Sequence, residues 1–145
     1  MVRQPVVFSE ESKCKVRILV ADDHRDIREL VENMLESNFE VVGTVDNGKA
    51  LVETALRLQP DVIITDISMP ILSGIEAAKQ LKESGSPAKV VFLTVHSDRD
   101  FVRACLDAGA SGYLVKLRMA TDLLPAIREA LAGRIFLSPT CDHQN

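Results

Sequence analysis

The stretch DVIITD, residues 61–66, is an apolar run with an aspartate at each end. A second run, VRILVA at residues 16–21, is followed at once by Asp22 and Asp23. Short continuous apolar runs rich in β-branched residues are typical of parallel strands covered on both faces. If these two strands are neighbours, Asp22, Asp23 and Asp66 converge outside the carboxyl ends of the sheet, where open α/β sheets bind ligands.

The rest of the chain alternates between strand and helix patterns. Further strands are predicted at 39–45, 89–94 and 111–115. Apolar residues spaced three and four apart predict helices over 26–37, 49–58, 75–83, 98–108 and 122–132. Five βα units predict an α/β fold with a parallel sheet and helices on both of its faces. Pro125 fits only if it lies near the first turn of the last helix.

The bulk composition is that of an ordinary globular domain. The chain has 145 residues, of which 46% are hydrophobic and 26% charged, and a formal net charge of −4. This charge does not favour nucleic-acid or membrane binding by the molecule as a whole, and no apolar run has membrane-spanning length. We expect a leader at 1–14, one domain at 15–138, a tail at 139–145 and a cytoplasmic location, since the leader lacks a secretory apolar region.

The three cysteines, Cys14, Cys105 and Cys141, are odd in number and form no CxxC motif. This usage favours a reducing compartment over a disulfide scaffold. None of them belongs to a metal-binding or catalytic motif that would support such a role. We therefore interpret them as buried or incidental thiols.

Polar residues stand at the ends of four predicted strands: Asp22 with Asp23, then Asp66, Thr94 and Lys116. Each suits one part of a phosphoryl transfer. Asp66 can be the nucleophile that forms an acyl phosphate, and the three carboxylates suit Mg²⁺ (or Mn²⁺), which neutralises charge on phosphoryl oxygens. The Thr94 hydroxyl can donate to one phosphoryl oxygen, and Lys116 can pair with another.

Each residue alone also has an ordinary interpretation. Asp22 or Asp23 could cap the helix that follows. Thr94 could be a plain strand end, Lys116 a solvated lysine, and Tyr113 a core aromatic with a wet hydroxyl. Their joint occurrence in this order at one rim favours the site.

Four segments carry a family resemblance: ILVADDH (18–24), DVIITDISMPILSGIEAAKQL (61–81), VVFLTVHSD (90–98) and GASGYLVK (109–116). With them, 16–137 resembles a response-regulator receiver domain of bacterial two-component signalling. The resemblance implies a flavodoxin-like (βα)5 three-layer sandwich with strand order 2-1-3-4-5. It also implies that Asp66 is the phosphoacceptor and that the Ser68 backbone carbonyl joins Asp22, Asp23 and Asp66 as a metal ligand.

By the same resemblance, Thr94 and Tyr113 form a switch pair. Thr94 would close toward the acyl phosphate, and Tyr113 would swing into the space behind it. This is a two-state equilibrium that phosphorylation biases. The implied role is a switch and not an enzyme.

Some residues near the site depart from the family pattern. Val95 stands where a small residue is usual, and its β-branched side chain is expected to crowd the path to Asp66 and slow phosphoryl entry or exit. His96 and Ser68 occupy positions that tune acyl-phosphate hydrolysis, although His96 could equally be an exposed residue without a role. Leu117 stands where many receivers have proline.

The segment 121–139, TDLLPAIREALAGRIFLSP, is similar to receivers of the LuxR-type DNA-binding subfamily. Such receivers normally lead to a helix-turn-helix domain, which is absent from this sequence. The chain is then either part of a longer transcriptional regulator or a stand-alone receiver that acts through protein–protein contacts. The implied partners are a sensor histidine kinase or phosphotransfer protein and a second copy in a homodimer, with DNA only through the missing domain and no membrane.

Three other functions compete. An Asp-nucleophile phosphohydrolase generally needs a second acid close after the nucleophile, where Ser68 stands here. A nucleotide or flavin binder would need a phosphate-cradling loop, and neither GxxxxGK[ST] nor GxGxxG occurs. A degenerate receiver used only for interaction would not need the complete set of polar residues.

Overall fold

The computed structural model of the chain describes residues 15–96 and 98–139. Strands and helices alternate along it, as predicted. The elements are β1 (Arg17–Ala21), α2 (Arg25–Leu35), β2 (Glu40–Val45), α3 (Gly48–Leu58), β3 (Val62–Thr65), α4 (Gly74–Glu83), β4 (Lys89–Thr94), α5 (Arg99–Asp107), β5 (Gly112–Val115), the short 3₁₀ helix η1 (Lys116–Arg118), α6 (Met119–Leu131) and β6 (Phe136–Leu137).

All strands are parallel and lie in the order β2-β1-β3-β4-β5-β6. The predicted order 2-1-3-4-5 is confirmed, but the sheet has a sixth strand that we did not predict. β6 is only two residues long, too short for a periodic signal, and it pairs with β5 through Gly112↔Phe136 and Tyr113↔Leu137. The β1–β3 register, Ala21↔Thr65, brings the residues that follow these strands to the same edge.

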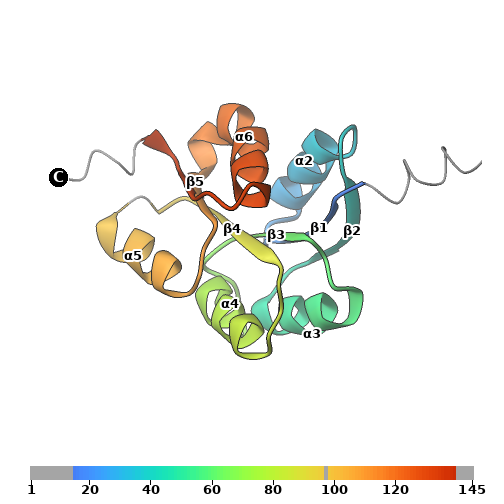
Figure 1. Cartoon of the computed structure of the whole chain (residues 1–145), viewed down its shortest axis with the longest axis vertical. Coiled ribbons are helices and arrows are strands. Elements are labelled where there is room, and N and C mark those ends of the chain that lie inside the picture. Colours follow the sequence, from blue (N-terminus) through green and yellow to red (C-terminus); the bar gives the residue numbers. More distant parts are fainter. Residues whose placement is uncertain (1–14, 97, 140–145) are drawn as a thin grey trace, which may run out of the picture.

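Figure 1 shows three layers, with α2 and α6 on one face of the sheet and α3, α4 and α5 on the other. Each face carries its own hydrophobic core. In β3, Ile63 belongs to the core under α3, α4 and α5, while Val62 and Ile64 belong to the core under α2 and α6. This explains why the run is continuously apolar: side chains alternate between two buried faces.

Polar side chains fix the start of three helices. The side-chain oxygens of Asn47, Ser73 and Asp98 accept hydrogen bonds from the backbone N–H groups of Ala50, Glu76 and Phe101. These N-caps satisfy donors that have no partner within the helix. They also hold the loops that precede α3, α4 and α5 at the carboxyl edge of the sheet.

The last helix differs from the prediction. It begins at Met119, directly after η1, so Pro125 lies in its interior and the expectation that this proline falls near the first turn is wrong. The apolar pattern predicted a start at residue 122, after the true start at Met119, because the 3₁₀ turn at Lys116–Arg118 leads directly into the helix. Pro125 removes one i→i−4 hydrogen bond, which the packing of the buried helix face offsets.

Cys105 is buried, and burial raises the pKa of its thiol to about 12, which supports its interpretation as an inert core thiol. Cys14 and Cys141, the predicted leader at 1–14 and the tail beyond Pro139 lie outside the described residues. Among the residues described, no helix combines the length and the apolar character needed to cross a membrane.

Candidate functional site

The predicted polar residues meet at the carboxyl edge of the sheet. Asp22 follows β1, Asp66 follows β3, Thr94 ends β4 and Lys116 follows β5. Backbone bonds hold the two buried acids in place: the Asp66 N–H donates to the Ala21 carbonyl at 3.0 Å, and the Asp22 N–H donates to the Val45 carbonyl at 3.1 Å. The central strand order therefore fixes where both carboxylates emerge.

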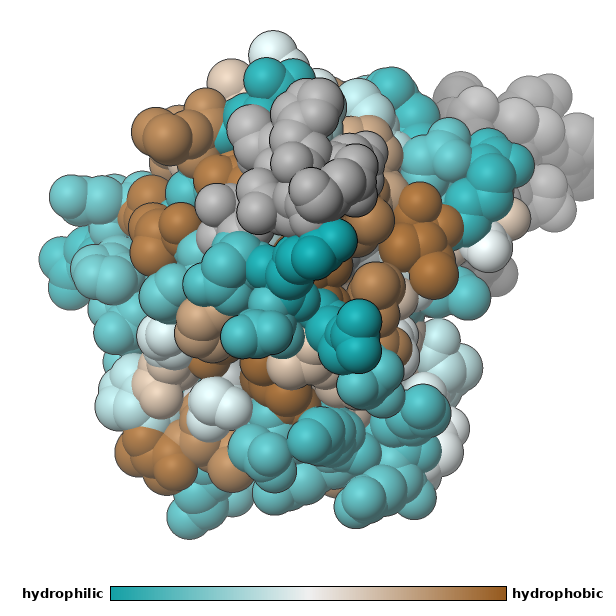
Figure 2. Space-filling view, turned by 90° about the vertical axis from the view of Figure 1, so that its left-hand side faces the viewer, coloured by the Kyte–Doolittle hydropathy of each residue, from teal (hydrophilic) through white to brown (hydrophobic). Residues whose placement is uncertain are grey.

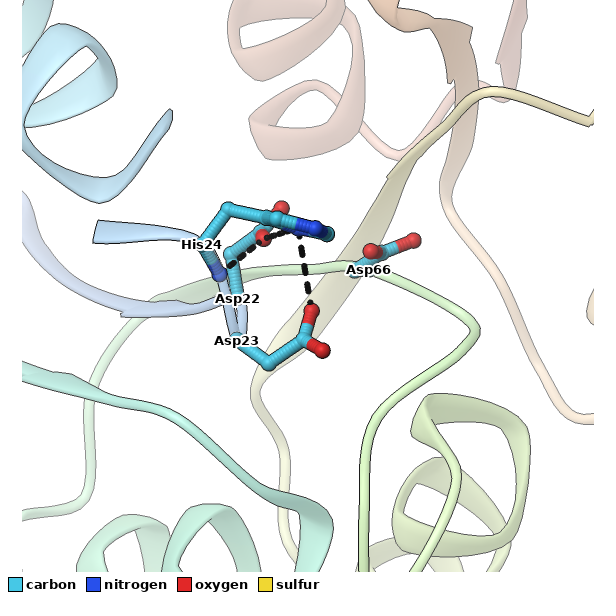
Figure 3. A group of neighbouring side chains, drawn as sticks. All are labelled: Asp22, Asp23, His24 and Asp66. Atoms are coloured by element: carbon cyan, nitrogen blue, oxygen red, sulfur yellow. Dashed lines mark hydrogen bonds and ion pairs between the residues drawn. The ribbon is translucent and has the colours of Figure 1, made fainter. Parts of the chain in front are cut away.

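Asp22 and Asp66 are buried, with exposed fractions of 2% and 5%, whereas Asp23 is exposed. One ligand atom from each of Asp22, Asp23, His24 and Asp66 lies within 4.8 Å of all the others. Figure 3 shows Asp66 beside the group formed by Asp22, Asp23 and His24. Carboxylates this close repel one another unless a cation lies among them.

Lys116 supplies one such cation. Its Nζ lies 2.8 Å from Asp22 Oδ2 and 3.2 Å from Asp66 Oδ2, and the lysine side chain is 11% exposed. Burial alone would lower the pKa of Lys116, but its hydrogen bonds and charge interactions with the two carboxylates outweigh burial and raise that pKa. Lys116 therefore stays charged at neutral pH.

The environment of Asp66, in contrast, disfavours the charged form of its side chain. Burial raises the pKa of Asp66 above its ordinary value, and the neighbouring Asp22 carboxylate raises it further. The opposing effects come from Lys116 and from the Ile67 N–H, which donates to Asp66 Oδ1 at 2.7 Å. Since the net shift is upward, the ionised carboxylate is incompletely compensated by the protein alone.

Asp22 shapes the turn into α2. Its Oδ1 accepts the His24 backbone N–H at 2.9 Å, and its carbonyl accepts from Arg28 Nη1 at 2.7 Å. The N-cap of α2 is His24, without a side-chain capping bond, so neither Asp22 nor Asp23 caps the helix as their ordinary interpretation allowed. The Asp22 side chain instead accepts the backbone N–H of His24, two residues further on, and so stabilises the turn before α2.

The acid group fits a hard divalent cation. Asp22 Oδ2 is buried, and its close contact within the described part of the chain is the ammonium of Lys116 at 2.8 Å. One lysine does not balance the charge of three neighbouring carboxylates, and a bound cation would offset the remainder. Asp22, Asp23 and Asp66 bring three carboxylates, the ligand type that Mg²⁺ prefers.

A tight loop sets the position of Asp66. The Thr65 hydroxyl donates to the Asp66 carbonyl at 2.9 Å, and the Gly74 N–H donates to the Ile67 carbonyl at 2.8 Å. A Cβ placed on Gly74 would lie 1.9 Å from the Asp66 carbonyl oxygen. Gly74 therefore lets the start of α4 pack directly against the backbone of Asp66.

The two predicted switch residues hold the same backbone segment. Thr94 Oγ1 accepts the His96 N–H at 3.2 Å, and the Tyr113 hydroxyl donates to the His96 carbonyl at 2.7 Å. Both side chains are fully buried. Because His96 touches both, a displacement of Thr94 would be felt at Tyr113 through one residue.

Ser68, Val95 and His96 lie along the rim. Ser68 Oγ is 3.4 Å from His96 Nε2, and the His96 ring stacks on Phe101 with centroids 4.2 Å apart. Val95 is 69% exposed. An open hollow of about 700 Å³ adjoins this rim, lined by Asp23, Ile67, Ser68, Met69, Pro70, Ser73, Ile75 and Phe101. The influence of Ser68, Val95 and His96 on reaction rates stays a prediction.

Three residues of the site escaped the sequence analysis: His24, Arg28 and Phe101. His24 had a signal, because an imidazole directly after two acids is a candidate ligand. Arg28 reaches the Asp22 carbonyl from the second turn of α2, and Phe101 reaches His96 from α5. These two contacts depend on how helices pack on the sheet, which a single sequence does not reveal.

Comparison with known proteins finds response regulators. A family model for the response regulator receiver domain matches residues 18–128. The nitrate/nitrite response regulator protein homolog of Haemophilus influenzae is 40% identical over 128 residues, covering 86% of this chain and 61% of that protein. The transcriptional regulatory protein DegU of Brevibacillus brevis is 37% identical over 131 residues, covering 89% of this chain and 56% of that protein. The chain thus spans 56–61% of the length of these relatives.

Solved structures agree with the sequence matches. A LuxR-family two-component response regulator from Aurantimonas sp. SI85-9A1 has a TM-score of 0.85 and 29% identity, covering 90% of this chain and 94% of that chain. The isolated REC domain of RcsB from Salmonella enterica serovar Typhimurium, in the presence of phosphomimetic BeF₃⁻, has a TM-score of 0.82 and 27% identity, covering 90% and 98%.

Proposed function

Because the chain belongs to the response regulator receiver domain family, we propose that Asp66 is its phosphoacceptor and that Asp22, Asp23 and the Ser68 backbone carbonyl complete a Mg²⁺ site around it. The family assigns the chain to two-component signalling; the residue roles are our proposal. The observation that carries it is the placement of Lys116 Nζ between Asp22 Oδ2 and Asp66 Oδ2, at 2.8 and 3.2 Å. This is the arrangement of nucleophile, cation and metal-binding acid that phosphoryl transfer to a carboxylate requires.

The two oxygens of Asp66 have different surroundings. Oδ1 accepts the Ile67 N–H at 2.7 Å, while Oδ2 faces Lys116. We assign Oδ2 as the attacking atom: it forms the new O–P bond as the bond from phosphorus to the donor's leaving atom breaks. The Ile67 bond orients the carboxylate, and Lys116 lies beside the new bond, where it can pair with a phosphoryl oxygen.

Bound Mg²⁺ would neutralise the negative charge that gathers on the phosphoryl oxygens. Asp22 and Asp23 would hold it, together with Asp66 and the Ser68 carbonyl. The ion would also offset the carboxylate charge that Lys116 alone does not balance, which is seen in the raised pKa of Asp66. Mn²⁺ fits the same oxygen donors.

The acyl phosphate would act through Thr94. Its hydroxyl accepts the His96 N–H and still has its own hydrogen to donate to a phosphoryl oxygen. Movement of Thr94 would disturb the backbone of His96, and with it the hydrogen bond from Tyr113. The surface around α5, β5 and α6 is then the part of the molecule that reports phosphorylation.

Receiver domains of this family interact with histidine kinases, and we propose a sensor kinase or phosphotransfer protein as the phosphodonor here. The matched relatives include proteins named as transcriptional regulators, and one solved structure contains RcsB dimers bound to DNA. We therefore propose transcription as the output, exerted by a longer protein that contains this domain. A homodimer of the receiver is part of this proposal. A stand-alone role through protein–protein contacts is the alternative, and the site chemistry is the same in both.

Acetyl phosphate and Mg²⁺ test the central assignment. Intact-mass measurement should show one added phosphoryl group on the parent chain, none with EDTA and none on Asp66→Asn. Asp107→Asn, which changes an exposed aspartate at the end of α5, is the matched control and should be labelled like the parent. Equal labelling of Asp66→Asn would contradict the proposal, and steady turnover of a phosphate ester would favour the phosphohydrolase instead.

A further inference from the structure

We propose that His24 is a direct ligand in the metal site and makes it prefer first-row transition metal ions over Mg²⁺. The inference rests on the proposed function, since it concerns the same metal site, and goes beyond it by naming a nitrogen ligand and its effect on ion choice. Neither an acid pair nor a receiver-type site requires an imidazole.

The position of the His24 ring carries the inference. Its Nδ1 lies 3.1 Å from Asp22 Oδ1 and 3.1 Å from Asp23 Oδ1, so the imidazole contacts both of the acids that precede it in the sequence. Figure 3 shows the His24 ring beside the Asp22 and Asp23 carboxylates, at the open side of the site, where the His24 side chain is 66% exposed. Among the described residues, His24 is the only non-carboxylate member of the four-residue group whose ligand atoms lie within 4.8 Å of one another.

These separations match adjacent ligands on one ion. Two ligand atoms at right angles, each about 2.1 Å from a metal, are about 3.0 Å apart. The two His24 contacts are both 3.1 Å, so the imidazole nitrogen and the two carboxylate oxygens need little movement to share an ion.

A second feature favours a bound cation. Asp22, Asp23 and Asp66 bring three carboxylates together, and the ammonium that faces Asp22 and Asp66, Lys116 Nζ at 2.8 and 3.2 Å, offsets only part of their charge. The backbone that carries the ring is also held: the His24 N–H donates to Asp22 Oδ1, and the His24 carbonyl accepts from the N–H groups of Ile27 and Arg28 at the start of α2. A ligand on so fixed a backbone loses little entropy on binding.

Nitrogen changes the preference of the site. Carboxylates, carbonyls and water suit Mg²⁺, whereas imidazole suits transition metals and binds Mg²⁺ poorly. A site of three carboxylates and one imidazole should therefore bind Co²⁺ more tightly than a site of oxygens alone, with a smaller gain for Mn²⁺ and little for Mg²⁺.

Calorimetric titration of the parent and His24→Asn with Mg²⁺, Mn²⁺ and Co²⁺ tests the inference. Asparagine keeps a polar residue suited to the N-cap of α2 but removes the imidazole. Even outer-shell groups change metal affinity about 10–100-fold, so loss of a direct ligand should weaken Co²⁺ binding at least about tenfold and leave Mg²⁺ within about threefold. Arg25→Ala, an exposed neighbour, controls for charge and should change all three ions alike.

NMR of the Co²⁺-loaded parent gives a readout that a purely structural histidine would not move. Coordination by Nδ1 predicts strongly shifted resonances from the His24 ring that are absent in His24→Asn. Equal losses for Mg²⁺ and Co²⁺ in His24→Asn, no loss for either, or a Co²⁺-loaded parent without shifted ring resonances would overturn the inference. Failure of the proposed function is separate: it would show as absent acetyl-phosphate labelling with any of the three ions bound.

Discussion

Asp66 is a carboxylate held where its charge is disfavoured. A carboxyl whose pKa is higher in the folded than in the unfolded chain stabilises the fold while protonated, and that contribution is lost as pH rises through the folded pKa. The raised pKa of Asp66, caused first by burial, thus means that its ionised form costs stability at neutral pH. A cation bound beside Asp66 would offset this loss of stability.

Replacement of Asp66 should therefore stabilise the metal-free protein. We expect Asp66→Asn to raise Tm at pH 7 in EDTA, because the buried charge and its repulsion by Asp22 disappear. The advantage should shrink as pH falls through the raised pKa toward 3.8, where the parent carboxyl becomes protonated. Asp107→Asn should show no such pH dependence, and a lower Tm for Asp66→Asn at pH 7 would contradict this reading.

Lys116 has the complementary role. Its raised pKa means that its stabilising contribution is complete at neutral pH and is lost only as pH rises through that raised value. We expect Lys116→Met to destabilise the metal-free protein by about 3–5 kcal/mol, the usual cost of breaking a buried ion pair. Saturating Mg²⁺ should restore more of the Tm in this variant than it adds to the parent. Urea unfolding with and without Mg²⁺ measures both, and an unchanged metal-free stability would refute it.

At the scale of elements, the end of β5 depends on the unpredicted strand β6. The Ser138 N–H donates to the Tyr113 carbonyl at 2.9 Å, and Ser138 Oγ accepts the Val115 N–H at 3.1 Å. The same hydroxyl donates to Asp122 Oδ2 at 2.9 Å. Ser138 and Asp122 are both buried, so this network joins α6, β5 and β6 directly behind Lys116.

The network makes a stability prediction. Ser138→Ala leaves the Val115 N–H without its acceptor and removes the Ser138 hydrogen bond to Asp122, which keeps its contact with Arg118; the loss should cost about 1–3 kcal/mol in urea unfolding. Ser84→Ala, at an exposed helix end, should cost little. A double-mutant cycle with Asp122→Asn should show coupling between the two residues; strictly additive effects would mean that β6 is not held by this bond.

The sequence predicted the strands that have long apolar runs, but not the shortest strand, the true start of α6 or the contacts made by helix packing. Strands β1 and β3 were predictable because each buries an unbroken run on both faces, and the acids after them had to meet if the strands were neighbours. β6 was not, because two residues carry no periodicity, and the early start of α6 was hidden by the turn at Lys116. Asp66, Asp22 and Lys116 were found by type and place, whereas the Arg28 and Phe101 contacts arise only from helix packing.

At the scale of the whole molecule, His96 links the carboxylate site to Tyr113, because its backbone is bonded to both Thr94 and Tyr113. Figure 2 shows the side of the molecule that bears α5, α6 and β6, where apolar residues form separate groups broken by polar ones. Leu117, Ile135 and Leu131 are among the exposed large apolar residues of these elements and the turns beside them. A change at Tyr113 would rearrange a surface of this kind, suited to a regulated partner.

The long-range change is measurable with BeF₃⁻, the phosphomimetic used with RcsB. With Mg²⁺ and BeF₃⁻, amide NMR shifts should change at Asp66 and also at His96, Tyr113 and α5. Thr94→Ala should confine the changes to the surroundings of Asp66, because the link from the site to His96 is removed. Thr44→Ala, an exposed threonine on β2, is the control and should behave like the parent. Full propagation in Thr94→Ala would argue against the switch.

The chemical identity of the modified residue tests the central claim most directly. Borohydride reduces an acyl phosphate and converts the aspartate that carried it to homoserine, which peptide mass spectrometry locates. After treatment with acetyl phosphate and Mg²⁺, the account predicts homoserine at position 66 and at no other aspartate. Homoserine at Asp22 or Asp23 instead, or a phosphorylated chain with an intact Asp66, would contradict it.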